Sequence, residues 1–74
     1  MLLKDLIANQ NFDINCYICI YDCTDNKCWC EKSPILTVYG TDHGILSLLN
    51  EHGLSDRNIR YITTHDDKII IECK

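Results

Sequence analysis

Residues 14–23, INCYICIYDC, decide the fold of this 74-residue chain. Their side chains alternate in character, and period-2 alternation is typical of a β-strand. One side of the predicted strand carries Ile14, Cys16, Ile18 and Ile20, and the other carries Tyr17, Cys19, Tyr21 and Cys23. The aliphatic side is the better candidate to lie under helices, because it has more apolar surface to remove from water.

A β-hairpin is the expected continuation of this strand. Thr24-Asp25-Asn26-Lys27 is a polar loop of turn-forming residues, and residues 28–31 return to an extended pattern. In such a hairpin Cys23 would oppose Cys28, Tyr21 would oppose Cys30, and Cys19 would oppose Lys32. Opposed residues share a face of a sheet. One predicted face therefore holds Tyr17, Cys19, Tyr21, Cys23, Cys28 and Cys30, and the other holds Ile18, Ile20 and Trp29.

Helical spacing marks two other segments. The first is a short amphipathic helix that ends near Asn9-Gln10-Asn11, after which Phe12 folds back onto its apolar face. Its apolar residues are Leu2, Leu3, Leu6 and Ile7. The second helix carries Ile45, Leu48 and Leu49; Thr41 or Asp42 can cap it, and Gly53 stands where a left-handed C-terminal residue is expected.

Three further strands complete the expected layout. Residues 35–39 form one, closed by Gly40, and residues 58–64 and 68–73 form a terminal hairpin around the tight loop His65-Asp66-Asp67. The element order is then helix, three strands, helix, two strands. We expect a single α+β domain over residues 1–74, with an antiparallel sheet of about five strands and both helices packed on one face.

A core of this size leaves little stability after conformational entropy is subtracted, and small domains are often stabilised further by disulfides or a metal. The six cysteines in 74 residues therefore require an explanation. The chain opens without a basic leader or an export-type apolar stretch, and no apolar run approaches the ~20 residues of a membrane span. We therefore expect reduced thiols and a protein of the cytoplasm. A small core also favours a homo-oligomer or another stabilising partner.

Three interpretations of the cysteines compete. They can serve as small hydrophobic residues covered by the fold or by a second subunit. They can instead form a structural zinc site, with Cys23, Cys28 and Cys30 as ligands and His43, His52 or His65 as the fourth. In the third interpretation, Cys23 and Cys28 form a redox pair beside the turn. We expect packing, and hence no cofactor, with zinc as the alternative.

Charge and motifs disfavour two classes of function. The net charge is −4, and the seven basic residues are scattered along the chain, whereas a phosphate backbone is bound by clustered Lys and Arg. Direct nucleic-acid binding is therefore not expected. The three histidines have no recognisable nucleophile motif beside them, so capping and turn roles are expected and the chain is interpreted as a non-enzyme.

Several stretches resemble short accessory proteins of phages and prophages of low-GC Gram-positive bacteria. The similar stretches are Leu3-Lys4-Asp5-Leu6-Ile7, the Phe12-Asp13 junction, residues 17–22 and the closing Asp67-Lys68-Ile69-Ile70-Ile71-Glu72. The resemblance implies a mobile-element protein that binds a host protein in the host cytoplasm. Some such proteins inhibit host defences, including CRISPR systems. The expected function is thus protein binding, with Tyr17, Cys19, Tyr21, Cys23, Cys28 and Cys30 at the interface and a small zinc or thiol-redox module as the alternative.

Overall fold

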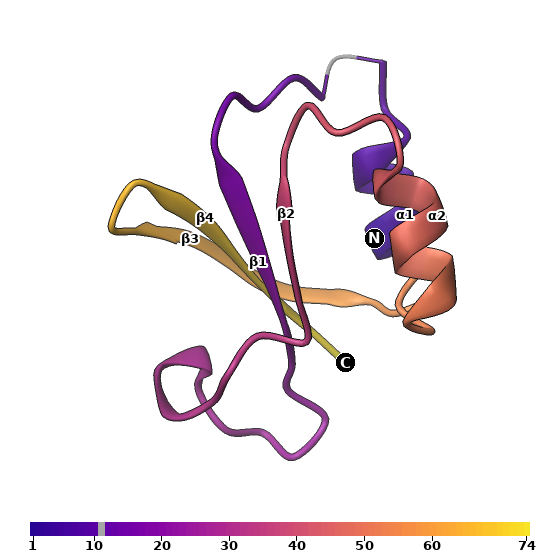
Figure 1. The fold of residues 1–74 in the computed structure, drawn as a ribbon. Helices are drawn as coiled ribbons and strands as arrows, with labels where there is room; N and C mark the ends of the chain where they lie inside the picture. The colour runs from indigo at the N-terminus through magenta and orange to yellow at the C-terminus, as the bar shows by residue number, and fades with distance from the viewer. Residues whose placement is uncertain (11) are drawn as a thin grey trace.

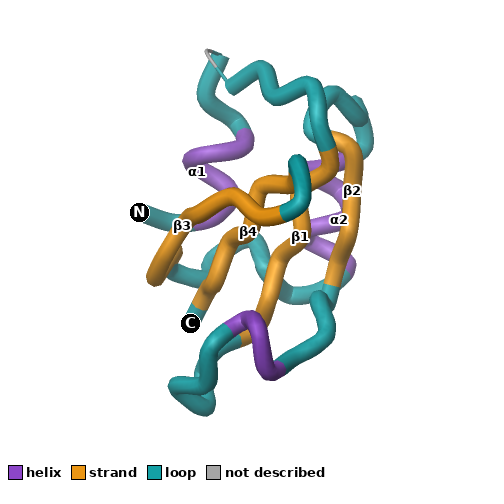
Figure 2. Tube along the Cα trace, turned by 90° about the vertical axis from the view of Figure 1, so that its left-hand side faces the viewer, coloured by secondary structure: helices purple, strands orange, loops and turns teal. Residues whose placement is uncertain are grey.

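Four strands form one mixed sheet, and both helices cover the same face of it (Figures 1 and 2). The computed structural model describes residues 1–10 and 12–74. The elements, in chain order, are α1 (Leu3–Ile7), β1 (Tyr17–Asp22), a 3-10 turn η1 (Trp29–Glu31), β2 (Leu36–Tyr39), α2 (Ile45–Glu51), β3 (Ile59–His65) and β4 (Lys68–Cys73). The α+β class is confirmed, but the described residues form four strands instead of about five.

The sheet order is β2-β1-β4-β3, which places β1 and β4 in the centre. β1 pairs antiparallel with β2 and parallel with β4, with Ile20 opposite Leu36 on one side and Ile71 on the other. The expected purely antiparallel sheet is therefore wrong. The reason lies in burial: β1 and β4 are each buried on both faces, and such strands occupy the interior of a sheet.

The predicted strand at residues 28–31 is also wrong, because these residues form the η1 turn. The backbone N–H of Glu31 donates to the Cys28 carbonyl at 3.0 Å, and that of Lys32 donates to the Trp29 carbonyl at 3.1 Å. Both edges of β1 are already paired with β2 and β4, so no edge remains for a hairpin at this position. The expected pairs Cys23/Cys28, Tyr21/Cys30 and Cys19/Lys32 do not form, and Cys19 lies opposite Thr37.

The main core lies between the helices and the sheet. Leu3 and Ile7 of α1 and Ile45 and Leu49 of α2 are buried, each pair one helical turn apart. The sheet contributes the aliphatic side predicted for β1, with Ile18 and Ile20, together with Leu36, Val38, Ile71 and Cys73. Phe12 packs against this core, as expected. Asn11, part of the predicted helix breaker, lies outside the described residues.

Two predicted turns are confirmed by their backbone angles. Asp66 and Asp67 both have positive φ, 51° and 63°, as a two-residue type I′ hairpin turn between β3 and β4 requires. Gly53 has φ of 66° directly after α2, the left-handed conformation expected for a residue that ends a helix. The predicted cap of α2 at Thr41 or Asp42 is wrong, because Gly44 is the N-cap and no side chain caps it; Asp42 instead accepts the Gly44 N–H at 2.7 Å.

The chain passes very close to the backbone of the segment before β1 at Gly40, the residue that follows β2. A Cβ at this position would lie 2.1 Å from the Ile14 carbonyl oxygen, and the Gly40 N–H donates to the Cys16 carbonyl at 2.8 Å. The obstacle is backbone, so it cannot move aside as a flexible side chain would. Only glycine fits here without a backbone shift.

We expect Gly40→Ala to lower the free energy of unfolding by about 2 kcal/mol or more, because the clash forces the strands apart. Urea unfolding followed by circular dichroism measures this change. Gly44→Ala is the control: its nearest contact is the Asp42 carboxylate at 3.3 Å, a side chain that can move. Equal destabilisation by both substitutions would contradict the close approach at Gly40.

Candidate functional site

The face of the sheet opposite the helices, here called the outer face, is the strongest candidate for function. Register places Tyr17 beside Tyr39, Cys19 beside Thr37, and Tyr61 beside Glu72 on this face. The parallel pairing adds Ile70 beside Cys19 and Glu72 beside Tyr21. All four tyrosines of the chain therefore lie on the outer face; the alternation of residues 14–23 predicts this for Tyr17 and Tyr21.

Trp29 covers the middle of the outer face. Its ring centroid lies 5.0 Å from that of His65 and 6.0 Å from that of Tyr21. Beneath it a second small core forms from Cys19, Tyr21, Cys23 and Ile70. The expected position of Trp29 on the helix side is therefore wrong: the turn at residues 29–31 folds back over the sheet instead of extending it.

A buried carboxylate holds this turn in place. Glu72 is 3% exposed, and its Oε2 accepts the Trp29 backbone N–H at 2.8 Å. Its Oε1 lies 3.5 Å from Arg60 Nε, so the buried charge has a partner of opposite sign. A buried carboxylate is tolerated only when it is paired and hydrogen-bonded in this way. Glu72 thus links β4, β3 and η1.

The loop that carries η1 is also tied down by two ion pairs. Asp22 lies 2.5 Å from the Arg57 guanidinium, and Asp25 lies 2.8 Å from Lys32 Nζ. Lys32 Nζ also donates to the Asp22 carbonyl. The backbone N–H of Thr24 and the Arg57 guanidinium lower the pKa of Asp22, and Lys32 lowers the pKa of Asp25. These contacts favour the charged carboxylates in the folded state.

The six residues predicted for the interface separate into two groups. Cys19, Tyr21 and Cys23 are buried within the chain itself, whereas Tyr17 and Cys30 are exposed and Cys28 is half-buried. Burial raises the pKa of the Cys23 and Cys73 thiols, so both stay protonated at neutral pH. Cys19, Cys23 and Cys73 pack as small apolar residues in the two cores.

The structure does not assemble the alternative zinc ligands Cys23, Cys28, Cys30 and His43. The segment between β2 and α2, which contains His43, lies at the opposite end of β2 from the segment between β1 and β2, which contains Cys28 and Cys30 (Figure 1). Among residues 1–10 and 12–74, no three His, Cys, Asp or Glu side chains are grouped to hold a metal ion. The predicted Cys23–Cys28 pair is not the close pair either, since Cys28 Sγ lies 2.8 Å from Cys30 Sγ.

A cleft of about 390 Å³ lies at the side of Trp29 on the outer face. Its walls are Cys28, Trp29, Arg60, Tyr61 and Glu72. Tyr61 is 51% exposed, so one aromatic wall is open to a partner. Sequence analysis missed Arg60 and Glu72 as site residues. The available signal was Glu72 itself, an acidic residue directly after three isoleucines in a strand.

The cleft adjoins the open edge of β3. The N-terminal segment covers the start of this edge, where the Ile59 N–H donates to the Met1 carbonyl at 2.9 Å and Leu2 bridges Asn58. Beyond Ile59, no part of the described chain pairs with the outer edge of β3. Ile62, at the middle of this edge, is 47% exposed. Uncovered apolar edge strands are templates for pairing with another chain.

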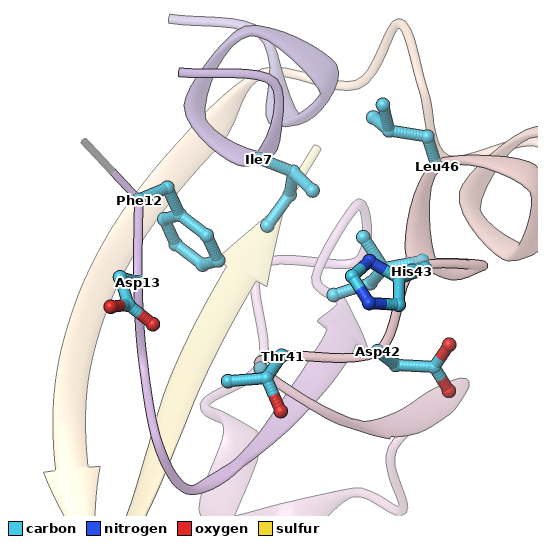
Figure 3. Close-up of a pocket in the computed structure, with 9 residues that line it drawn as sticks. Ile7, Phe12, Asp13, Thr41, Asp42, His43 and Leu46 are labelled. Carbon is cyan, nitrogen blue, oxygen red and sulfur yellow. The ribbon is translucent and has the colours of Figure 1, made fainter. Parts of the chain in front are cut away.

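A second cavity, of about 340 Å³, lies on the helix side between α1 and the start of α2 (Figure 3). Ile7 and Phe12 give it an apolar wall, while Asp13, Thr41 and His43 stand at its border (Figure 3). Asp42 is already engaged with the Gly44 N–H. Within the part of the chain that the structure describes, no hydrogen bond at this cavity joins the Thr41 hydroxyl to His43, Asp13 or Asp42.

No protein-family model matches this chain, and no curated protein or solved structure matches it either. Among the described residues, none of the helices has the length and apolar character needed to cross a membrane.

We expect Glu72→Ala to lower the free energy of unfolding by about 2 kcal/mol, since it leaves Arg60 and the Trp29 N–H without their partner. Trp29 fluorescence should shift to longer wavelength as the ring becomes more exposed. Glu31→Ala, on the same turn but exposed, is the matched control. Tryptophan emission and urea unfolding check both, and an equal effect of the two substitutions would argue against the Glu72 anchor.

Acid should destabilise the loop through Asp22 and Asp25. Their folded-state pKa values lie below the ordinary 3.8, so their stabilisation is present above pH 3.8 and is lost as pH falls through the folded values. Asp22→Asn should therefore flatten the decrease in unfolding free energy between about pH 5 and pH 2. Urea unfolding across this range measures it, with Asp5→Asn on α1 as control; an unchanged slope in Asp22→Asn would be the contrary result.

Proposed function

We propose that this protein is a non-enzymatic binding module that captures an extended segment of another protein along the open edge of β3. The observation that carries the proposal is the uncovered edge from Tyr61 to His65, with Tyr61 and Ile62 about half exposed. Following the resemblance to phage and prophage accessory proteins, the partner would be a host protein in the bacterial cytoplasm, with inhibition of a host defence as one form of that role.

The backbone of β3 has hydrogen-bonding groups for such a partner on the side that faces away from β4. The two-residue turn makes His65 and Lys68 a hydrogen-bonded pair, and such pairs alternate along an antiparallel ladder. Thr63/Ile70 and Tyr61/Glu72 are then the next hydrogen-bonded pairs. The backbone N–H and C=O groups of Ile62 and Thr64 consequently point away from β4, where an added strand would meet them.

The cleft beside this edge offers a place for one side chain of the bound segment. Trp29 and Tyr61 provide aromatic walls, while the Glu72 carboxylate is buried and already paired with Arg60. Aromatic faces favour a cation. The chain's net charge of −4 and the carboxylates of Asp66 and Asp67 at the tip of the hairpin add to this preference. The partner segment we propose is therefore extended and carries Lys or Arg.

A second copy of this chain is the competing occupant of the same edge. Two β3 strands could pair antiparallel about a two-fold axis, which is the usual symmetry of a homodimer. The expected homo-oligomer would then use the edge of β3 in place of the cysteine face. The oligomeric state in solution distinguishes this occupant from a host protein.

Ile62→Lys should abolish capture of the partner by placing a charge at the centre of the pairing edge. Leu46→Lys is the matched control, since Leu46 is similarly exposed, at 44%, but lies on α2 beside the second cavity, away from the edge of β3. The measurement is affinity capture from a bacterial lysate with quantitative mass spectrometry, followed by titration of the purified partner. Binding should weaken at least about 100-fold in Ile62→Lys only.

Three results would count against the proposal. Loss of binding in Leu46→Lys alone would move the site to the cavity between α1 and α2. Turnover of a substrate by the wild-type protein would replace the binding role with an enzymatic one. Dimers of the free protein that dissociate in Ile62→Lys would assign the edge to a second copy.

A further inference from the structure

We propose that Cys28 and Cys30 form a dithiol site that closes into an intramolecular disulfide by exchange with a low-molecular-weight disulfide of the glutathione type. The proposal goes beyond the binding function and does not depend on it. It rests on two adjacent sulfurs, 2.8 Å apart, on a loop where Cys30 is exposed and Cys28 is half-buried. Cys28 and Cys30 are therefore within reach of a small oxidant.

Separation of the sulfurs favours a disulfide over a shared metal ion. A disulfide bond is about 2.05 Å long, so the two sulfurs need to approach by only about 0.8 Å. Two thiolates on a tetrahedral zinc ion, with Zn–S of about 2.3 Å, would lie about 3.8 Å apart. The η1 turn holds the pair through the hydrogen bond from Glu31 N–H to the Cys28 carbonyl, at 3.0 Å.

Hydrogen bonding assigns different roles to the two thiols. Cys28 Sγ accepts from the Cys30 thiol at 2.8 Å and from the Cys30 backbone N–H at 3.5 Å. Cys28 Sγ is therefore the acceptor of both contacts, and we assign it the attacking role. The same hydrogen bond to Cys28 raises the pKa of Cys30, which keeps the second proton until the first exchange is complete.

The exchange balances in two steps. The Cys28 thiolate attacks one sulfur of oxidised glutathione, which forms a Cys28–glutathione bond and releases one glutathione thiolate. Cys30 then gives its proton to solvent and attacks the Cys28 sulfur, which forms the Cys28–Cys30 bond and releases the second glutathione thiolate. Two protein thiols are oxidised, and one glutathione disulfide is reduced to two thiols.

Other cysteines are poor competitors for this reaction. Cys19, Cys23 and Cys73 are buried, and burial raises the pKa of the last two. Cys16 is half-buried, like Cys28, but it precedes β1, whereas η1 follows the other end of that strand, so Cys16 is not placed to close a disulfide with Cys28 or Cys30. A buried thiol is protonated and shielded from a dissolved disulfide. The fold thus leaves one reactive pair among six cysteines.

Closure of the disulfide would act directly on Trp29, the residue between the two cysteines. Trp29 is the only tryptophan of the chain, and its ring packs on Tyr21 and His65. A covalent bond across the turn would reduce the freedom of this cover over the outer face. Trp29 emission therefore reports on the state of the dithiol without an added probe.

Trypsin provides a direct test, because cleavage after Lys27 and Lys32 releases both cysteines in one peptide, residues 28–32. Cys16, Cys19 and Cys23 fall in residues 5–27, and Cys73 falls in residues 69–74. The folded protein is incubated with oxidised glutathione, its remaining thiols are alkylated, and the peptides are weighed. We expect peptide 28–32 to be unalkylated and about 2 Da lighter, forming at least about tenfold faster than any other thiol modification.

Matched variants test the assigned roles. Cys30→Ser should accumulate the glutathione adduct on Cys28, because the resolving thiol is gone, while Cys28→Ser should react at least about tenfold more slowly than wild type. Cys16→Ser should behave as wild type. A crosslink between peptides 28–32 and 5–27, a persistent glutathione adduct in the wild-type protein, or no reaction would overturn the proposal. Partner capture by Cys30→Ser, a position outside the walls of the cleft, is measured in parallel, so failure of this site and failure of the binding function remain distinguishable.

Discussion

Parallel pairing of β1 with β4 is the constraint on which the rest of the structure depends. Ile18, Ile20 and Ile71 bring aliphatic side chains to one face, and Cys19 and Ile70 bring smaller apolar surface to the other. Both faces of the central pair must therefore be covered. The two helices cover the aliphatic face, and β2 and β3 are left as edges.

Coverage of the outer face is much lighter than that of the helix face. One tryptophan from the loop between β1 and β2 covers the centre, and it is held there by the buried carboxylate of Glu72. Burying a charge is costly unless it is paired, so Arg60 is part of the same arrangement. Because so little of the chain covers the outer face, Tyr61 and the edge of β3 remain exposed, and these form the candidate binding site.

Cysteines serve two separate purposes in this fold. Cys19, Cys23 and Cys73 are small apolar residues of the two cores. Cys28 and Cys30 lie outside both cores, on the turn that presents Trp29. Composition alone could not separate these groups, because every cysteine looks the same until its exposure is known.

The sequence alone determined the elements that depend on contacts between residues near one another in the chain. The alternation in residues 14–23 appears as the shorter strand Tyr17–Asp22, and the helical spacing of Leu3 and Ile7 and the Asp66-Asp67 turn appear as expected. Only the tertiary structure decided that β4 lies beside β1 and that residues 29–31 turn back over the sheet. A strand pattern specifies which side chains share a face but not which strand lies beside it. Residues 28–31 have a strand-like pattern, yet Glu72, more than forty positions later in the chain, provides the partner that holds them as a turn.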